Sequence, residues 1–310
     1  MIAWRNVLMT ATLTGVSAVP MFAQEIPNEG PVRTTALIAA ESKNQTPLDP
    51  SLLTIQVNGH SSPITAVTPI TPGAAQIAIL IDDGLRGSFS LQLQDIKKFL
   101  GSLPPGAKVM VGYMQNGEVR QVTNGFTSDH NAAASELRVP MSAPGMSASP
   151  YFCLEDFVKH WPSAEAGPKF VLMITNGVDP YNGRPGIMNQ DSPYVQESQE
   201  AAERAGVAVY SIYYGDTGMR GGGAYLSGQS YLQQVGAATG GQLLSGGITP
   251  VSFSPFLDQF RKYLMESYTV TFMASANHEK GNTLTSIKVK TSQPDVKIHA
   301  PEGVHPGVVE

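Results

Sequence analysis

Between residues 77 and 266, short apolar runs rich in valine and isoleucine alternate with segments that have the period of an amphipathic helix. The runs are IAILI, KVMVGYM, VRQVT, KFVLMIT, VAVYSIYY and GQLLSG, which begin at residues 77, 108, 119, 169, 207 and 241. Most of them lack regular polar alternation, so they predict strands buried on both faces. Helices are predicted at 91–101, 129–137, 150–160, 194–205, 229–238 and 254–266. Strands separated by helices predict a doubly wound, mostly parallel sheet flanked by helices, which is the α/β class.

The two ends of the chain have a different pattern. Residues 51–72 alternate apolar and polar residues around Asn58-Gly59, a turn dipeptide, and predict a β-hairpin. Residues 267–302 alternate in three runs, at 268–275, 284–291 and 296–300. Connections this short cannot join parallel strands, so we expect both ends to build one small antiparallel β unit beside a domain at 75–266. Residues 24–50 show no sustained period and predict a flexible lead-in, and residues 303–310 predict a tail.

The first 23 residues have the pattern of a secretory signal peptide. Arg5 precedes an apolar run that starts at Val7, and small residues surround Ala18 and Ala23. The run is broken by threonines and is too short for a stable membrane span. We expect cleavage after Ala23 and export to the periplasm or the medium, with no stable span after cleavage. An uncleaved anchor is the alternative.

Composition and motifs exclude several classes of function. The net charge is −5 and there is no basic cluster, which argues against nucleic-acid binding. The sequence holds no G-x-S-x-G, no H-E-x-x-H and no phosphate-binding G-x-x-x-x-G-K-[ST], and its six histidines are scattered. The single cysteine, Cys153, lies among aromatic and aliphatic residues and predicts a buried, inert thiol. We therefore expect a protein that is not an enzyme.

Two adjacent carboxylates follow the first buried run, in IAILIDDGLRGSFSLQLQDIKKFL (77–100). An acidic pair at the end of a strand needs a cation, a catalytic task or a hydrogen-bond network. Arg86 follows Asp82 by four positions, and its guanidinium can pair with Asp82 or Asp83. We expect Arg86 and turn N–H groups to hold the pair. The alternative is that Arg86 points to solvent and the aspartates coordinate a dication through water.

The order of these motifs resembles the von Willebrand factor type A (vWA) domain, and more narrowly the VWFA-related proteins of Acidobacteria. The resemblance covers about residues 77–265 and rests on AILIDDGLRGSFS, KFVLMITNGVDPYNG, ERAGVAVYSIYYGD and LQQVGAATGGQLL, followed by ESYTVTF. It implies a Rossmann-like fold and a binding module that acts through the loops at the carboxyl edge of the sheet. The flanking β segments also look like those of that subfamily.

In the vWA family a metal-ion-dependent adhesion site holds Mg²⁺ or Mn²⁺ through Asp-x-Ser-x-Ser, a threonine from a second loop and the aspartate of a TDG turn. Asp82 matches the first position, while Gly84 and Arg86 stand where the two serines would be. Asn176 replaces the aspartate of TDG, and Ser147 is the nearest candidate for the threonine. The resemblance therefore implies a degenerate site without a metal cofactor. A weak Mg²⁺ or Mn²⁺ site on Asp82 and Ser147 is the alternative.

The loops at the predicted carboxyl edge are rich in tyrosine, glycine, serine and asparagine, a composition suited to protein or glycan recognition. Their tyrosines are Tyr151, Tyr181, Tyr194, Tyr214, Tyr225 and Tyr231. The predicted ligand-binding residues are Asp82, Asp83, Arg86, Ser147, Asn176, Tyr181 and Tyr225. We expect the partner to be an unidentified protein or envelope component. Alternatives are a Mg²⁺-dependent adhesion module, a structural scaffold of an envelope complex, and an enzyme that uses Asp82, Asp83 and Arg86.

Overall fold

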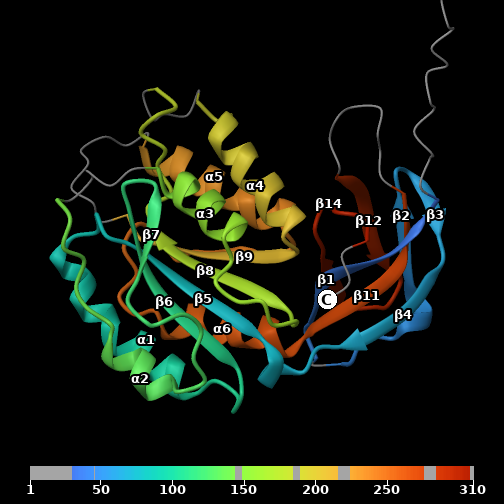
Figure 1. Cartoon of the computed structure of the whole chain (residues 1–310), viewed down its shortest axis with the longest axis horizontal. Helices are drawn as coiled ribbons and strands as arrows, with labels where there is room; N and C mark the ends of the chain where they lie inside the picture. Colours follow the sequence, from blue (N-terminus) through green and yellow to red (C-terminus); the bar gives the residue numbers. More distant parts are fainter. Residues whose placement is uncertain are drawn as a thin grey trace, which may run out of the picture.

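The computed structural model describes residues 30–44, 46–143, 149–183, 189–215, 224–275 and 284–307. An α/β domain and a smaller β sandwich lie side by side (Figure 1). The predicted signal peptide at 1–23 lies outside the described residues. Within the described part of the chain, no helix is long and apolar enough to cross a membrane.

The α/β domain is built on a six-stranded sheet with the order β10-β9-β8-β5-β6-β7. The strands are β5 (Gln76–Asp82), β6 (Lys108–Gln115), β7 (Glu118–Gln121), β8 (Lys169–Thr175), β9 (Val207–Tyr213) and β10 (Leu243–Leu244). All pairs are parallel except β6 with β7, which form an antiparallel hairpin. The strand order reverses at β5, and in open α/β sheets the carboxyl end of such a strand is the usual place for a ligand site.

Helices cover both faces of this sheet (Figure 1). One face carries α1 (Leu93–Gly101), α2 (His130–Ser135) and α6 (Ser254–Met265), and the other carries α3 (Pro150–Lys159), α4 (Pro193–Arg204) and α5 (Ala224–Ala238). Side chains of β5 alternate between the two cores, with Ile77 and Ile79 in one and Ala78 and Leu80 in the other. The predicted doubly wound, mostly parallel sheet is confirmed.

Strands from both ends of the chain form the sandwich, as predicted. One sheet has the order β13-β1-β11-β4 and the other β14-β12-β2-β3. The strands are β1 (Val32–Ser42), β2 (Leu53–Val57), β3 (His60–Ser62), β4 (Ile64–Pro69), β11 (Ser267–Ala274), β12 (Thr285–Thr291), β13 (Val296–His299) and β14 (Gly303–Val304). Short 3-10 turns lie at η1 (Pro50–Leu52), η2 (Pro72–Ala74) and η3 (Gly87–Gln92).

β1 corrects one prediction, because it lies inside the segment expected to be a flexible lead-in. Ile38 and Ala40 pack into the core of the sandwich, whereas Leu37 and Ala39 pack into the core of the α/β domain. A strand buried on both faces has no polar alternation, so its period could not be recognised in the sequence. The predicted tail is also wrong where residues 303–304 form β14.

Candidate functional site

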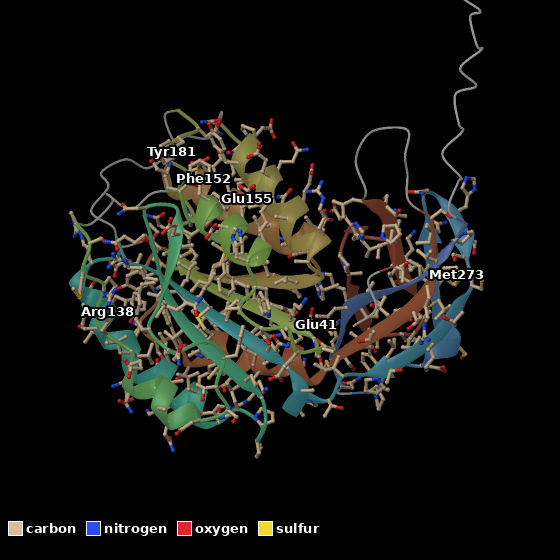
Figure 2. The ribbon with its side chains drawn as sticks, in the orientation of Figure 1. Glu41, Arg138, Phe152, Glu155, Tyr181 and Met273 are labelled. Atoms are coloured by element: carbon tan, nitrogen blue, oxygen red, sulfur yellow. The ribbon has the colours of Figure 1, made fainter. Side chains whose placement is uncertain are left out.

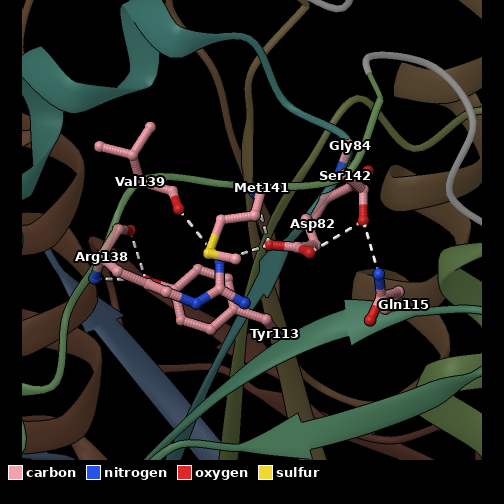
Figure 3. Close-up of polar contacts among 9 residues, drawn as sticks. Asp82, Gly84, Tyr113, Gln115, Arg138, Val139, Met141 and Ser142 are labelled. Carbon is pink, nitrogen blue, oxygen red and sulfur yellow. Dashed lines mark hydrogen bonds and ion pairs between the residues drawn. The ribbon is translucent and has the colours of Figure 1, made fainter.

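The acidic pair lies at the carboxyl end of β5, where three loops meet (Figure 3). Asp82 is the last residue of the strand, and both carboxylates are almost completely buried. Asp82 contacts the end of β8, and Asp83, in the turn that follows β5, contacts the segment after α2. The sheet order therefore brings these polar groups together, as the sequence predicts for the carboxyl edge.

Asp83 is held by a cation and two further donors. Arg138 Nη1 lies 2.7 Å from Asp83 Oδ1, and the N–H of Met141 donates to the same oxygen at 3.1 Å. The hydroxyl of Ser142 donates to Asp83 Oδ2 at 2.8 Å. Burial acts to raise the pKa of Asp83, but the bonds from Arg138, Met141 and Ser142 outweigh it, so the pKa lies below its ordinary value. Asp83 is therefore a charged carboxylate that protein groups neutralise.

Arg138 is itself fixed in place. Its guanidinium lies 3.8 Å from the centre of the Tyr113 ring, which is close enough for a cation–π contact. The Tyr113 hydroxyl donates to the Arg138 carbonyl at 2.6 Å, and the Arg138 N–H donates to the same hydroxyl at 2.8 Å. On the other side of the pair, Gln115 Nε2 donates to the Ser142 hydroxyl at 2.8 Å (Figure 3). The residues of β6 thus hold the 138–142 segment against Asp83.

The hypothesis that Arg86 supplies the charge beside Asp83 is wrong. Arg138 supplies it, from 55 residues further along the chain. Arg86 lies in an exposed turn directly before η3. No local pattern marks Arg138, because the contact depends on how two distant loops meet. Sequence spacing alone therefore favoured the nearer arginine.

Among the described residues, two neutral groups donate to Asp82. Its Oδ1 accepts the N–H of Gly84 at 2.8 Å, and its Oδ2 accepts the hydroxyl of Thr175 at 2.8 Å. The Thr175 hydroxyl in turn accepts the N–H of Gly177 at 3.2 Å. No motif in the sequence marks Thr175 as a partner of Asp82. The β5–β8 register, which pairs Ile81 with Ile174, places it there.

Asn176 is buried and uses its side chain in its own turn. Its Oδ1 accepts the N–H of Val178 at 2.8 Å, which fixes an Asx turn after β8. α5 packs directly on this turn, since a Cβ at Gly228 would lie 2.2 Å from the Asn176 carbonyl oxygen. The amide oxygen that would replace the family's carboxylate is thus engaged with backbone.

The described tyrosines of these loops differ in burial, and Tyr194 is half-buried. Tyr151, Tyr214 and Tyr231 are buried, so the prediction that they belong to a binding face is wrong. Tyr151, for example, donates from its hydroxyl to the Gly177 carbonyl at 2.7 Å. Tyr181 is 58% exposed and lies against Phe152, with 5.2 Å between ring centres (Figure 2). Ser147 and the side chain of Tyr225 lie outside the described residues.

Apolar side chains are exposed on η3, on the 138–142 segment and on the loop after β10. We call this set the apolar rim, and it comprises Leu91, Val139, Met141, Ile248 and Val251. Leu91 and Met141 are each 76% exposed, and Val251 is 97% exposed. The side-chain amide of Gln92 donates to the carbonyls of Pro250 and Val251, which ties η3 to the loop after β10. The edge therefore presents apolar groups outward and its charges inward.

The donor set does not fit a dication. The oxygens of Asp83 accept bonds from a guanidinium, an N–H and a hydroxyl, and those of Asp82 accept an N–H and a hydroxyl. A Mg²⁺ ion would compete with these donors and would be repelled by Arg138. In the described part of the chain, no three His, Cys, Asp or Glu residues are grouped so as to hold a metal. The acidic pair has the chemistry of an internal hydrogen-bond network.

A scan against protein-family models and a search of curated proteins find no match. Among solved structures, the chain is similar to a von Willebrand factor type A protein from Catenulispora acidiphila, with a TM-score of 0.47, 11% identity, and coverage of 89% of this chain and 74% of that one.

The chain is also similar to two other solved structures. One is an aerotolerance-related membrane protein of Bacteroides fragilis that carries multiple mutations to serines, and the other is the manganese-loaded TRAP protein of Plasmodium vivax. The first has a TM-score of 0.43 at 10% identity and covers 61% of this chain and 97% of that one. The second has a TM-score of 0.43 at 12% identity, and the match covers 78% of this chain and 98% of that one. Similarities this low say nothing about a ligand. The strand order, the helices on both faces and the motifs along β5, β8 and β9 together give the α/β domain a vWA-type fold.

Proposed function

We propose that this chain is an exported, non-enzymatic binding module that recognises a protein through the apolar rim, without a metal ion. The observation that carries the proposal is that the carboxyl edge buries its charged side chains and exposes apolar ones. Asp82 and Asp83 are buried and bonded to protein groups, while Leu91, Met141 and Val251 are exposed. Export rests on the signal-peptide pattern of the first 23 residues.

The exposure of the rim supports a protein partner over a glycan. Clustered apolar side chains on the surface of a soluble domain are typical of protein-interaction sites. Leu91 and Val251 are contributed by two loops that the Gln92 amide holds together, so their relative position is fixed before binding. Tyr181 and Phe152 add an aromatic surface on the α3 side of the same edge.

The same contacts support binding without a dication. A metal-dependent site would need the Asp82 and Asp83 oxygens free to coordinate, and each of these carboxylates has donors from the chain itself. An enzyme that uses the acidic pair is disfavoured for a related reason. The hydrogen bonds to Asp83 hold its pKa low, whereas a general base works best with a pKa near the working pH.

The test is a quantitative pull-down from envelope extract with the full chain, with EDTA and with Mg²⁺. We expect capture of one partner that is equal in the two buffers. The Leu91→Asp, Val251→Asp double variant should weaken capture about 30- to 1,000-fold, since it removes two anchors worth roughly 1–2 kcal/mol each. Met265→Asp is the matched control, because Met265 is 59% exposed on α6, outside the rim.

Two outcomes would overturn the proposal. Capture that is lost in EDTA and restored by Mg²⁺ would support a metal-dependent adhesion module instead. Capture that survives the double variant but is lost in Met265→Asp would move the binding surface away from the carboxyl edge and would favour a scaffold role.

A further inference from the structure

The segment 300–304 joins the two domains. The N–H of Glu302 donates to the Ala238 carbonyl at 2.8 Å, at the end of α5, and the Glu302 carbonyl accepts the N–H of Ile287 from β12 at 2.8 Å. Pro301 forms an isolated bridge with Thr239, and β14 pairs with β12 in the sandwich. We call residues 300–304 the strap. It is bonded to the α/β domain on one side and to the sandwich on the other.

Glu203 holds the strap at its centre. This residue is the second-last of α4, and its Oε1 accepts the N–H of Gly303 at 2.7 Å. A Cβ at position 303 would lie 3.2 Å from that oxygen, so glycine allows the close approach. The carboxyl group thus lies in the seam between α4 and β14.

Several features of this seam disfavour a negative charge on Glu203. Burial raises the pKa of Glu203 to about 7, the nearby Glu302 and Glu200 add to the rise, and the Gly303 bond and Arg204 only partly oppose it. Arg204 forms an ion pair with Glu200 at 2.9 Å. The carboxyl end of α4 adds the negative end of the helix dipole.

Glu203 lines a cavity of about 20 Å³ whose wall is mostly apolar. The polar side chains that line this cavity with Glu203 are those of Thr35 of β1, Thr239 and His305. This volume is enough for about one water molecule. The His305 ring is bonded to the Pro306 carbonyl at 3.0 Å. The described charged or titratable groups near Glu203 are Glu200 and Arg204 on α4, and Glu302 and His305 on the chain that follows β13. Lys169 of β8 also reaches the end of α4, where its ammonium donates to the Ala205 carbonyl at 3.3 Å.

We propose that Glu203 is a proton-controlled latch between the two domains. The neutral acid stays in the seam and keeps the strap bonded to α4. The carboxylate, repelled by Glu302 and Glu200, turns outward to water and gives up the Gly303 bond. The sandwich then loses one of its attachments to the α/β domain as the pH rises.

The direction of the pH dependence follows from the linkage between proton binding and stability. The folded-state pKa of Glu203 is raised from 4.5 to about 7. Its stabilising contribution is complete below the unfolded pKa and is lost as the pH rises through the folded value. Opening of the strap should therefore become about tenfold more favourable between about pH 6 and about pH 8.

Amide hydrogen exchange of the full chain, read on peptides that cover residues 296–307, tests this latch. After correction for the intrinsic pH dependence of exchange, we expect the protection of the strap to fall about tenfold between about pH 6 and about pH 8. Glu203→Gln should make the protection independent of pH over this range. Glu197→Gln, which changes an exposed glutamate on the same helix, is the matched control and should keep the pH step.

A flat profile in the wild-type chain, or an equal pH step in Glu203→Gln, would overturn the proposal. A variant that fails to fold does not block the test, because the wild-type profile needs no substitution. A carboxyl NMR titration of the wild-type chain is a second measurement, and a Glu203 midpoint near its ordinary 4.5 would also refute the latch.

Discussion

Replacing Arg138 by methionine should destabilise the protein and make its stability depend differently on pH. Asp83 is only 3% exposed at its side chain, and the Met141 N–H and Ser142 hydroxyl would be its remaining described donors. Breaking a fully buried ion pair costs about 3–5 kcal/mol. Arg138 is 30% exposed, so solvent screening reduces the cost to about 2–3 kcal/mol, of which the Tyr113 contact is about 0.5 kcal/mol.

The pH dependence provides the sharper test. In the wild-type chain the pKa of Asp83 is below its ordinary 3.8, so its contribution to stability is present above that value and is lost as the pH falls through the folded pKa. Without Arg138, burial dominates and the pKa of Asp83 rises. The difference in free energy of unfolding between the two proteins should therefore shrink from neutral pH toward about pH 4, measured by urea melts.

Two further variants complete this experiment. Arg261→Met removes one partner of the exposed pair with Asp258 and should change stability by less than about 1 kcal/mol. The double variant Asp83→Asn, Arg138→Met should recover part of the loss, because no uncompensated charge remains. An Arg138→Met protein within about 0.5 kcal/mol of wild type, at all pH values, would refute the view that Arg138 neutralises Asp83.

Three other predictions concern the same edge of the sheet. Thr175→Val removes a donor from buried Asp82 and should cost about 1–3 kcal/mol in urea melts, whereas a loss below about 0.5 kcal/mol would count against that bond. Gly228→Ala places a methyl group 2.2 Å from the Asn176 carbonyl oxygen and should lower the melting temperature by at least several degrees, about 1–3 kcal/mol. Thermal melts of the wild-type chain in EDTA and in excess Mg²⁺ should coincide, and a higher melting temperature with Mg²⁺ would indicate a retained metal site.

The arrangement of the α/β domain could be predicted because its strands and helices follow from hydrophobic patterns over short stretches of sequence. The apolar runs at 77–81 and 169–175 fall within β5 and β8, and the helix signals at 150–160 and 254–266 match α3 and α6 within one residue at each end. Proline at the first helical position begins α3 and α4, and serine side chains cap both helices. Patterns of this kind depend on neighbours within about one helical turn.

The candidate site was harder to predict because its contacts are long-range. Asp82 and Asp83 were identified from their position after a buried run, but Arg138 and Thr175 reach them only through the tertiary fold. Composition also misplaced the tyrosines, since a tyrosine in a loop sequence can turn its ring into the core, as Tyr214 does. Tertiary packing determines which side chains face outward, and this packing cannot be inferred from a single sequence.

The pairing of β1 has a consequence for how the chain reaches its folded state. Val32 lies opposite Ala274, so β1 can pair with β11 only after the whole α/β domain has been synthesised. The α/β domain is in effect an insertion within the sandwich, and loop closure over such a distance makes assembly of the sandwich slow. A chain cut short before β11 would lack both sheet neighbours of β1, which are β11 and β13, and would leave the edges of β1 open to other molecules. Truncated products should therefore aggregate or be degraded rather than accumulate as a folded α/β domain.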